Sequence, residues 1–309
     1  MRVTHRMLVR SALRDLQAST QRLGAYQEQL SSGKRIHRPS DDPFGVQRAL
    51  GFRGELKALE VCRQNISLSQ DWLNATEITL DKLADVIIRA RDVAIRGADD
   101  SVGQEARQAL AAEAAQLLGS ALQVANTSSQ GRFLFAGYRI DQVPFGGQDE
   151  HGSPTDDPSA IVTVVYNGDS GAIVRELEPG VSLQINFTGA ESWLDPDSAT
   201  SVFAALIDLR DSLAAGDGDG VRDALGSLDT VLDMAVQARA VAGAKLQRLS
   251  LAGDKLEAVS LGLQSLLSAT EDVDMAEAVV NYAQQEAVYR AALQVNSRIL
   301  PMSLLDYLK

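Results

Sequence analysis

The sequence predicts a mainly α protein, an elongated antiparallel bundle of long helices with paired N- and C-terminal helices and a small β-rich insertion. Apolar residues recur at heptad spacing on both sides of a central stretch. Aromatic residues make up only 5% of the 309 residues, which is typical of long helices packed through small and aliphatic side chains. The central residues 139–198 are rich in Gly, Pro and Asp, which indicates turns and short strands.

Residues 5–30 predict the first helix. Its apolar seam is thin because Thr20 and Gln27 interrupt it, and a lone helix of this kind is marginal in water. It therefore needs a partner helix. The predicted seam consists of Val9, Leu13, Leu16, Thr20, Leu23, Gln27 and Leu30.

A short basic loop separates this helix from the next one. Gly33 can take the left-handed conformation that ends a helix. Asp42 can cap the following helix, and Pro43 fits its first position. We therefore interpret Asp41 and Asp42 as capping residues rather than as a catalytic pair.

The second predicted helix runs for about 50 residues from Pro43, because a sevenfold repeat continues there without a break. Such a constant spacing favours a left-handed coiled bundle. Cys62, the only cysteine, lies on this seam and is interpreted as a packing residue, and it excludes an intramolecular disulfide. The repeat consists of Phe52, Leu59, Ile66, Leu73, Leu80, Ile87 and Ala94, with Cys62, Ser69, Thr76, Leu83 and Ala90 at the companion positions.

Residues 97–103 interrupt the heptads, and a third helix follows that should pack antiparallel to the second. It ends at residues 126–131. Its predicted seam consists of Leu110, Ala114, Leu117, Ala121 and Val124.

The insertion, residues 133–198, is predicted to be β-rich, with its strand order left open. Residues 132–138 are interpreted as a strand that concentrates aromatic side chains. Further strands are predicted within residues 161–166, 172–177 and 181–187.

Helical spacing returns near Thr200 with Val202, Leu206, Leu209 and Leu213. Residues 216–220 resemble the start of a calcium loop, but Leu228 stands where the bidentate acid is required, so they predict a turn and a helix cap. The long helix that follows has its seam at Val221, Leu225, Leu228, Leu232, Ala235, Ala242, Leu246, Leu249, Leu256, Leu263 and Leu267, with Arg239, Gly253 and Ser260 as interruptions.

A break or kink is predicted at residues 270–274, before a last helix over about residues 275–300. Pro301 interrupts that helix, and residues 302–309 end the chain with apolar residues. The last helix presents one apolar stripe, formed by Ala276, Val280, Ala283 and Ala287.

This order of elements is nearly a palindrome, which favours a chain folded back on itself. Residues 1–42 with 271–309 are predicted to form a terminal coiled-coil assembly region. Residues 43–132 with 199–270 are predicted to form a helical rod, and residues 133–198 an insertion that caps its far end. The end helices are expected to stay unpaired in the monomer and to gain a core only on assembly.

The charge is divided unevenly along the chain. The net charge of −12 argues against broad nucleic-acid binding and anionic-membrane binding. Residues 1–35 carry seven basic and two acidic side chains, so this arm is +5 and the remaining chain is −17. A solvated helix face would explain the charge of this basic arm as well as a contact surface would. We expect the basic cluster Lys34, Arg35 and Arg38 to meet an acidic surface on a neighbouring subunit.

The sequence shows no pattern for catalysis, a cofactor or a metal. The three histidines are widely separated, and no phosphate-binding loop, nucleophile elbow or zinc pattern occurs. We therefore expect a non-enzyme without a cofactor or metal. No apolar run of signal-peptide or membrane-span length occurs, which predicts a cytosolic chain or export without a cleavable signal.

Two motifs at opposite ends carry a family resemblance. Residues 30–35 (LSSGKR) with 39–43 (PSDDP) resemble the N-terminal motif of flagellin-like axial proteins of bacterial flagella. Residues 272–278 (DVDMAEA) resemble their C-terminal motif. Residues 131–138 (GRFLFAGY), Pro144-Phe145 and the start MRV are similar to the hook–filament junction branch of the family, the third hook-associated proteins.

The resemblance implies a structural component of the flagellum that is secreted, unfolded, through the flagellar export apparatus. It implies a ring of subunits between the first hook-associated protein and flagellin, help from an export chaperone, and assembly through coupled folding of the terminal helices. The implied interface holds the end-helix seam and the basic pair, namely Val9, Leu13, Leu16, Leu23, Leu30, Lys34, Arg35, Ala276, Val280, Ala283 and Ala287. A flagellin and a cytosolic coiled-coil adaptor, or an enzyme housed in the insertion, remain the alternatives.

Overall fold

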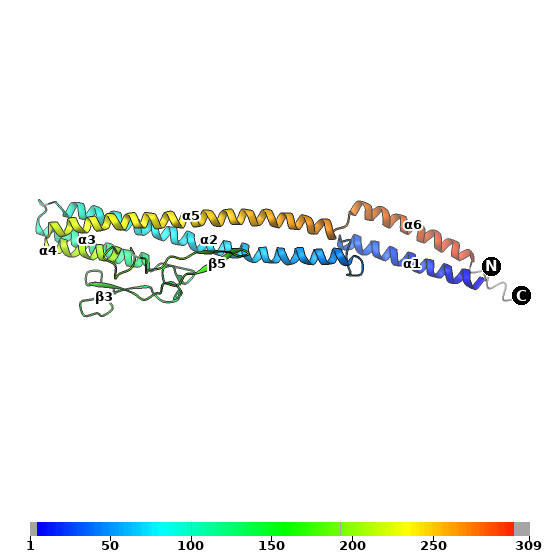
Figure 1. Ribbon diagram of the computed structural model, residues 1–309, viewed down its shortest axis with the longest axis horizontal. Coiled ribbons are helices and arrows are strands. Elements are labelled where there is room, and N and C mark those ends of the chain that lie inside the picture. Colours follow the sequence, from blue (N-terminus) through cyan, green and yellow to red (C-terminus); the bar gives the residue numbers. More distant parts are fainter. Residues whose placement is uncertain (1–4, 100, 192, 300–309) are drawn as a thin grey trace. The chain divides into compact units, whose positions relative to one another are not determined.

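The computed structural model describes residues 5–299 except 100 and 192, so the predicted features at residues 301–309 lie outside the described residues. Helices dominate the described chain, as predicted (Figure 1). They are α1 (His5–Ser32), α2 (Pro43–Gly97), α3 (Gln104–Ala125), α4 (Val202–Ala215), α5 (Gly218–Glu271) and α6 (Met275–Ile299). The strands are β1 (Ser128–Ser129), β2 (Arg132–Phe133), β3 (Phe145–Gln148), β4 (Thr163–Tyr166), β5 (Val174–Glu178) and β6 (Val181–Gln184).

The described chain divides into two compact units. Unit 1 holds the residues up to Ala58 and those from Ala258 onward, and unit 2 holds Leu59–Glu257. Unit 1 therefore contains α1, α6, and the start of α2 with the end of α5. Unit 2 contains α3, α4, the rest of α2 and α5, and the strands β1 to β6.

The core of unit 2 confirms the heptad seam predicted for α2. Leu73, Leu80 and Ile87 of α2 are fully buried, and Cys62 is buried in the same hydrophobic core. Ser69 and Thr76 also face inward, where each hydroxyl donates to the carbonyl four residues earlier. The α5 seam is confirmed as well, since Leu228, Ala235 and Ala242 are fully buried.

Ion pairs join the helices of unit 2 at the edges of this core. Arg96 at the end of α2 donates from one guanidinium nitrogen to both carboxylate oxygens of Glu113 on α3, each at 3.0 Å. Arg239, the charged interruption in the α5 seam, reaches Glu77 at 2.9 Å and Asp81 at 2.7 Å on α2. The polar residue that breaks the heptad thus contacts the neighbouring helix across the seam.

The turns between helices close the end of this bundle. Arg107 of α3 donates to the carbonyl of Gly216 at 2.6 Å, and Gln104 donates to that of Ala214 at 3.2 Å. Gly216 has a φ of 74° and ends α4, and Asp217 accepts from the Gly220 amide at 3.1 Å. The predicted turn and cap at residues 216–220 are confirmed.

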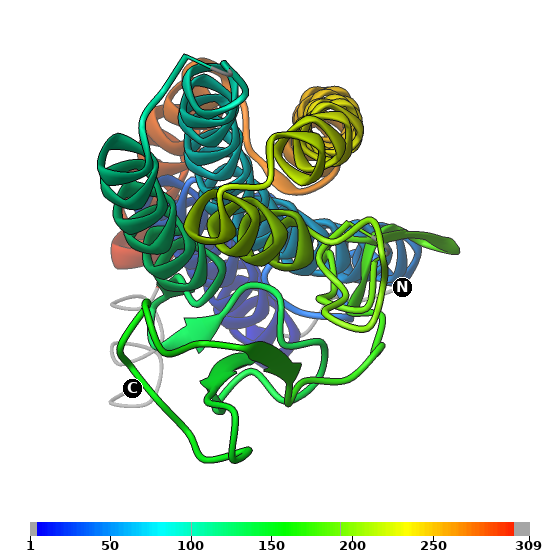
Figure 2. The same cartoon turned by 90° about the vertical axis from the view of Figure 1, so that its left-hand side faces the viewer.

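The insertion lies along the side of the helices, so the expectation that it caps the far end is wrong (Figures 1 and 2). Asn65 on α2 donates to the Glu176 carbonyl at 3.1 Å, and Lys255 on α5 pairs with Glu178 at 2.5 Å. Arg210 of α4 also donates to the carbonyl of Ile161, 2.5 Å away. Hydrogen bonds to the sides of three helices hold the insertion there.

The insertion is built from separate antiparallel strand pairs. β1 pairs with β2, β3 with β4 and β5 with β6. The predicted strand at residues 132–138 is wrong beyond β2, because residues 134–137 are all buried and their backbone bonds go to scattered partners. β3 was missed, since Gly146 and Gly147 at its centre are poor strand formers.

Candidate assembly interface

The loop between α1 and α2 is built by local capping. Gly33 has a φ of 72°, and its amide donates to the Gln29 carbonyl at 2.8 Å, which ends α1. Asp42 accepts from the Gly45 amide at 2.8 Å and caps α2 ahead of Pro43. That backbone hydrogen bond holds the pKa of Asp42 below its ordinary value.

Asp41 has a different task from the one predicted. Its carboxylate accepts from the Arg38 amide at 2.8 Å and the His37 amide at 3.1 Å, so it shapes the loop instead of capping the helix. These backbone hydrogen bonds lower the pKa of Asp41. Neither acid is arranged for proton transfer.

The break between α5 and α6 lies directly beside this loop. The Arg35 amide donates to the Glu271 carbonyl at 2.7 Å, and the Val273 amide donates to the Gly33 carbonyl at 3.0 Å. Asp274 then caps α6 by accepting from the Ala276 amide at 2.9 Å. We call this paired break, residues 33–42 with 270–274, the joint.

Glu271 is the electrostatic centre of the joint. Its side chain is only 8% exposed, and Arg53 of α2 holds both its oxygens, at 3.0 and 2.7 Å. Lys34 pairs with it as well. Burial raises the pKa of Glu271, but the hydrogen bonds and charges of Lys34 and Arg53 outweigh this effect and leave the pKa below its ordinary value.

The basic pair therefore has partners within its own chain. Lys34 reaches Glu271, and Arg35 donates to the Thr270 carbonyl at 2.8 Å and approaches Asp42 at 3.4 Å. Sequence reasoning missed Glu271 and Arg53, because no pattern in the sequence reports a pair 218 residues apart. Contact between the basic pair and a neighbouring subunit stays a prediction.

The helices α1 and α6 lie side by side within unit 1 (Figure 1). The end helices are therefore paired in a single chain, and the expectation that they stay unpaired in the monomer is wrong. Ser19 of α1 is buried, and its hydroxyl oxygen accepts a hydrogen bond from the side-chain Nε2 of Gln285 at 2.9 Å. Among the described side chains of these two helices, only Ser19 and Ala278 are buried. The pair thus has a seam but almost no core.

Four of the seven residues of the predicted α1 seam lie on the less exposed face. Val9, Leu16, Leu23 and Leu30 are partly buried as predicted, but Leu13 is 52% exposed. Thr20 and Gln27 are exposed too. The positions one residue earlier take their place, because the partner helix lies on that side: Ala12, Ser19 and Tyr26.

The predicted stripe on α6 points away from α1. Ala276, Val280, Ala283 and Ala287 are all exposed, Val280 at 64%. The less exposed stripe is more polar and was missed for that reason. It consists of Ala278, Tyr282, Gln285, Tyr289 and Ala292.

Exposed apolar side chains therefore cover the outer faces of the helix pair. On α6, Val279, Val288 and Val295 are each at least half exposed, in addition to Val280. Apolar residues of this number on one short helix pair mark a surface that packs against other helices. The helix pair can bury these faces against further copies of the chain or against partner chains.

No three His, Cys, Asp or Glu side chains are grouped to hold a metal within residues 5–299. No helix in the same range is long and apolar enough to cross a membrane. Burial raises the pKa of the Cys62 thiol, which suits a packing residue.

Comparison with known proteins gives matches at both ends of the chain. The bacterial flagellin N-terminal helical region matches residues 3–139, and the bacterial flagellin C-terminal helical region matches residues 225–308. Flagellar hook-associated protein 3 of Escherichia coli (strain K12) is 24% identical over 335 aligned positions that cover 100% of both chains.

Other similar proteins come from the filament and from the junction. The flagellar filament 30.7 kDa core protein of Treponema maltophilum is 24% identical and covers 94% of this chain and 93% of that protein. The flagellar junction protein FlgL from Legionella pneumophila has a solved structure with a TM-score of 0.57 and 16% identity, and the match covers 74% of this chain and 100% of that one. At this identity the structural likeness shows a shared fold.

Proposed function

This chain belongs to the family of bacterial flagellin-like axial proteins, and from that premise we propose that it forms the junction between the hook and the filament of a flagellum. It is a structural protein of the flagellum and acts there without catalysis. On the hook side it contacts the first hook-associated protein, and on the filament side it contacts flagellin. Copies of the chain form a ring between the two.

One observation carries the proposal, namely the joint. The joint connects the N-terminal and C-terminal family motifs through the Arg35–Glu271 and Val273–Gly33 backbone hydrogen bonds. The joint therefore presents α1 and α6 as one two-helix unit whose outer apolar faces are uncovered. Such a unit gains stability only when neighbours cover it, which couples the ordering of the ends to assembly.

The interface follows from the same geometry. The exposed α6 stripe and Leu13 would meet neighbouring subunits, while the partly buried Val9, Leu16, Leu23 and Leu30 keep the pair together. Lys34 and Arg35 act first within the chain, and their exposed edges could reach an acidic neighbour as a second role. Export would pass through the flagellar apparatus with a chaperone on the unfolded ends, and the protein would end up outside the cell.

Deletion of the gene tests the junction role. Cells that lack the protein should make hooks but shed flagellin into the medium, and a plasmid copy should restore filaments. Normal filaments in the deletion strain would contradict the proposal. Immunogold labelling should place the protein in a thin band beside the hook.

A flagellin is the second candidate, because the matching family models are those of bacterial flagellin and a filament core protein matches nearly the full length. Copy number separates the two. A filament subunit dominates sheared flagella, whereas a junction protein is scarce in them.

A further inference from the structure

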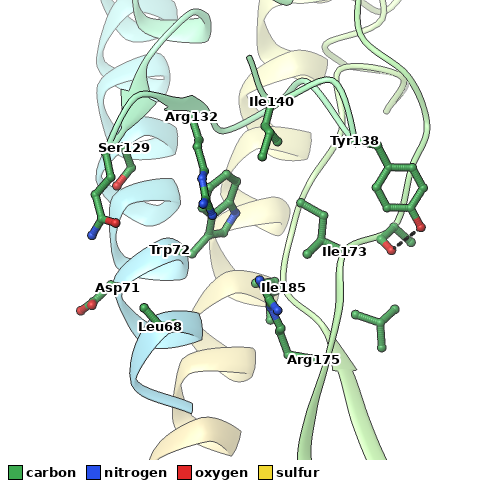
Figure 3. Close-up of a pocket in the computed structure, with 13 residues that line it drawn as sticks. Leu68, Asp71, Trp72, Ser129, Arg132, Tyr138, Ile140, Ile173, Arg175 and Ile185 are labelled. Atoms are coloured by element: carbon green, nitrogen blue, oxygen red, sulfur yellow. Dashed lines mark hydrogen bonds between the residues drawn. The ribbon is translucent and has the colours of Figure 1, made fainter. Parts of the chain in front are cut away.

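Unit 2 contains a cavity of about 510 Å³ between α2 and the insertion, and the joint and the terminal helices contribute nothing to it (Figure 3). Its apolar walls come from Leu68 on α2 and from Ile140, Ile173 and Ile185 in the insertion. Tyr138 fixes one side by donating to the Ala172 carbonyl at 2.9 Å. A hydrogen bond within the insertion therefore holds one wall of the cavity in place.

Two arginines line this cavity. Arg132 comes from β2 and Arg175 from β5, and Figure 3 shows both guanidinium groups pointing into the same space. Neither side chain has an ion pair or a hydrogen bond to another residue in the described part of the chain. Two uncompensated like charges at one apolar cavity create a positive potential that favours an anion.

Trp72 also lines the cavity, and its indole Nε1–H is buried without an acceptor among the described residues. Asp71 also lines the rim, but its carboxylate points away from the arginines in Figure 3. A ligand with a negatively charged acceptor beside an apolar group therefore matches the guanidinium donors and the apolar walls of this cavity.

A tight hairpin fixes the position of Arg132. Gln130 and Gly131 link β1 to β2 with φ values of 53° and 77°, which is the two-residue turn that matches strand twist. Glutamine is an unusual residue at a positive φ, where Asn or Gly is favoured. The next residue is Arg132, so the turn holds it rigidly at the cavity rim.

We propose that this cavity binds an acidic side chain from residues 149–157 of a second copy of this chain. Residues 140–174 contain six acidic residues and no Lys or Arg, so their charge complements the arginines. Glu150, Asp156 and Asp157 are exposed. Guanidinium groups bind a carboxylate through paired hydrogen bonds, which selects it over a neutral side chain.

The occupant comes from another copy because a chain holds its own acidic segment elsewhere. Thr155 and Asp156 line a separate cavity beside Gly119 of α3. The Thr155 amide also donates to the Gly147 carbonyl at 3.0 Å, which ties the segment to β3. The contact thus adds an insertion-to-rod interaction between copies, independent of the proposed role at the junction.

Binding of a labelled peptide to the full-length soluble protein tests this proposal. A fluorescein-labelled peptide of residues 146–160 should bind with saturable anisotropy, and added NaCl should weaken the binding. Arg132→Gln with Arg175→Gln should lower its affinity about tenfold or more. The matched control, Arg89→Gln with Arg248→Gln, removes the same charge from exposed sites and should leave affinity within about twofold.

Three outcomes would overturn the proposal. The first is no binding of the peptide up to about 1 mM. The second is equal binding of a peptide whose acids are replaced by Asn and Gln. The third is displacement of the peptide by equimolar acetate or phosphate, which would mean that the cavity takes any small anion. Circular dichroism of each variant confirms that it is folded.

Discussion

The helices of unit 2 and the helix pair of unit 1 both carry apolar residues at heptad spacing, but these residues differ in how deeply they are buried. In unit 2, apolar seam positions such as Leu73, Leu80 and Ile87 are completely buried. In α1 the equivalent Leu13 is 52% exposed, and only Ser19 and Ala278 are buried on the described faces of α1 and α6. Helices in a bundle are covered on several sides, whereas two paired helices cover only one stripe each.

The difference teaches that similar sequence patterns serve two purposes. Unit 2 buries its apolar seam residues in its own core, although other apolar side chains such as Ile88 and Val236 are exposed there. Unit 1 keeps its apolar side chains on the outer faces of the helix pair, so a single chain cannot stabilise them. The four changes below test that contrast, in order of decreasing effect on folding.

The largest loss of stability is expected for Leu80→Ala. The side chain is fully buried, so its removal leaves a cavity and should lower the free energy of unfolding of unit 2 by about 2–5 kcal/mol. Leu13→Ala, on the exposed face of α1, should change the free energy of unfolding of unit 1 by less than about 0.5 kcal/mol. Urea unfolding followed by circular dichroism measures both, and equal losses would remove the contrast.

A smaller, local loss is expected for Glu271→Ala at the joint. It removes the acceptor of Lys34 and Arg53, which are 39% and 51% exposed and can turn to water, so the loss should be about 1–2 kcal/mol. Hydrogen exchange of the Val273 amide should quicken by about tenfold. The control Glu60→Ala breaks an exposed pair with Arg63 and should leave this exchange unchanged.

The same contact should depend on pH. The folded-state pKa of Glu271 lies below its ordinary value of 4.5, so its stabilisation is complete above that value and is lost as pH falls through the folded pKa. The stability difference between the native protein and Glu271→Gln should therefore be present at about pH 7 and shrink below about pH 4. Melting temperatures of both proteins across this range measure it. A difference that stays constant with pH would show that Glu271 is not the titrating group.

The smallest effect on folding and the largest effect on assembly are expected for Leu13→Asp with Val280→Asp. Both side chains are exposed, at 52% and 64%, so the melting temperature should hardly change. Incorporation into flagella should be lost, because the outer face of the helix pair becomes charged. Leu23→Asp, on the partly buried face, should lower both stability and incorporation.

Blots of sheared flagella measure incorporation for these variants. A double variant that assembles normally would show that the exposed faces are not the interface. In that case the buried seam and the joint alone would carry the assembly role.

Much of the fold could be predicted from the sequence. The break at residues 270–274, the Gly33 stop and the Asp42 cap follow from local capping chemistry, and the structure confirms each. The seams of α2 and α5 were also predicted correctly, because neighbouring helices cover the seam positions, with Leu73, Leu80, Leu228 and Ala235 fully buried. Residues 132–138 were misread, because a buried run without alternation does not distinguish strand from irregular chain.

The side of α1 that faces α6 could not be predicted. Leu13 is more apolar than Ala12, and Val280 is more apolar than Gln285, yet the less apolar residues form the contact. Hydrophobicity identifies faces that avoid water, but it does not say whether a neighbour in the same chain or in another chain covers them.

Local sequence patterns predict where each helix begins and ends, since caps and heptads act over a few residues. The motifs at both ends predict the family. Three-dimensional packing alone brings those motifs together in one joint around Glu271, and it alone places Arg132 and Arg175 at one cavity with Trp72. These contacts join residues far apart in the chain, and their geometry depends on how the packed helices and strands are placed, which no local pattern records.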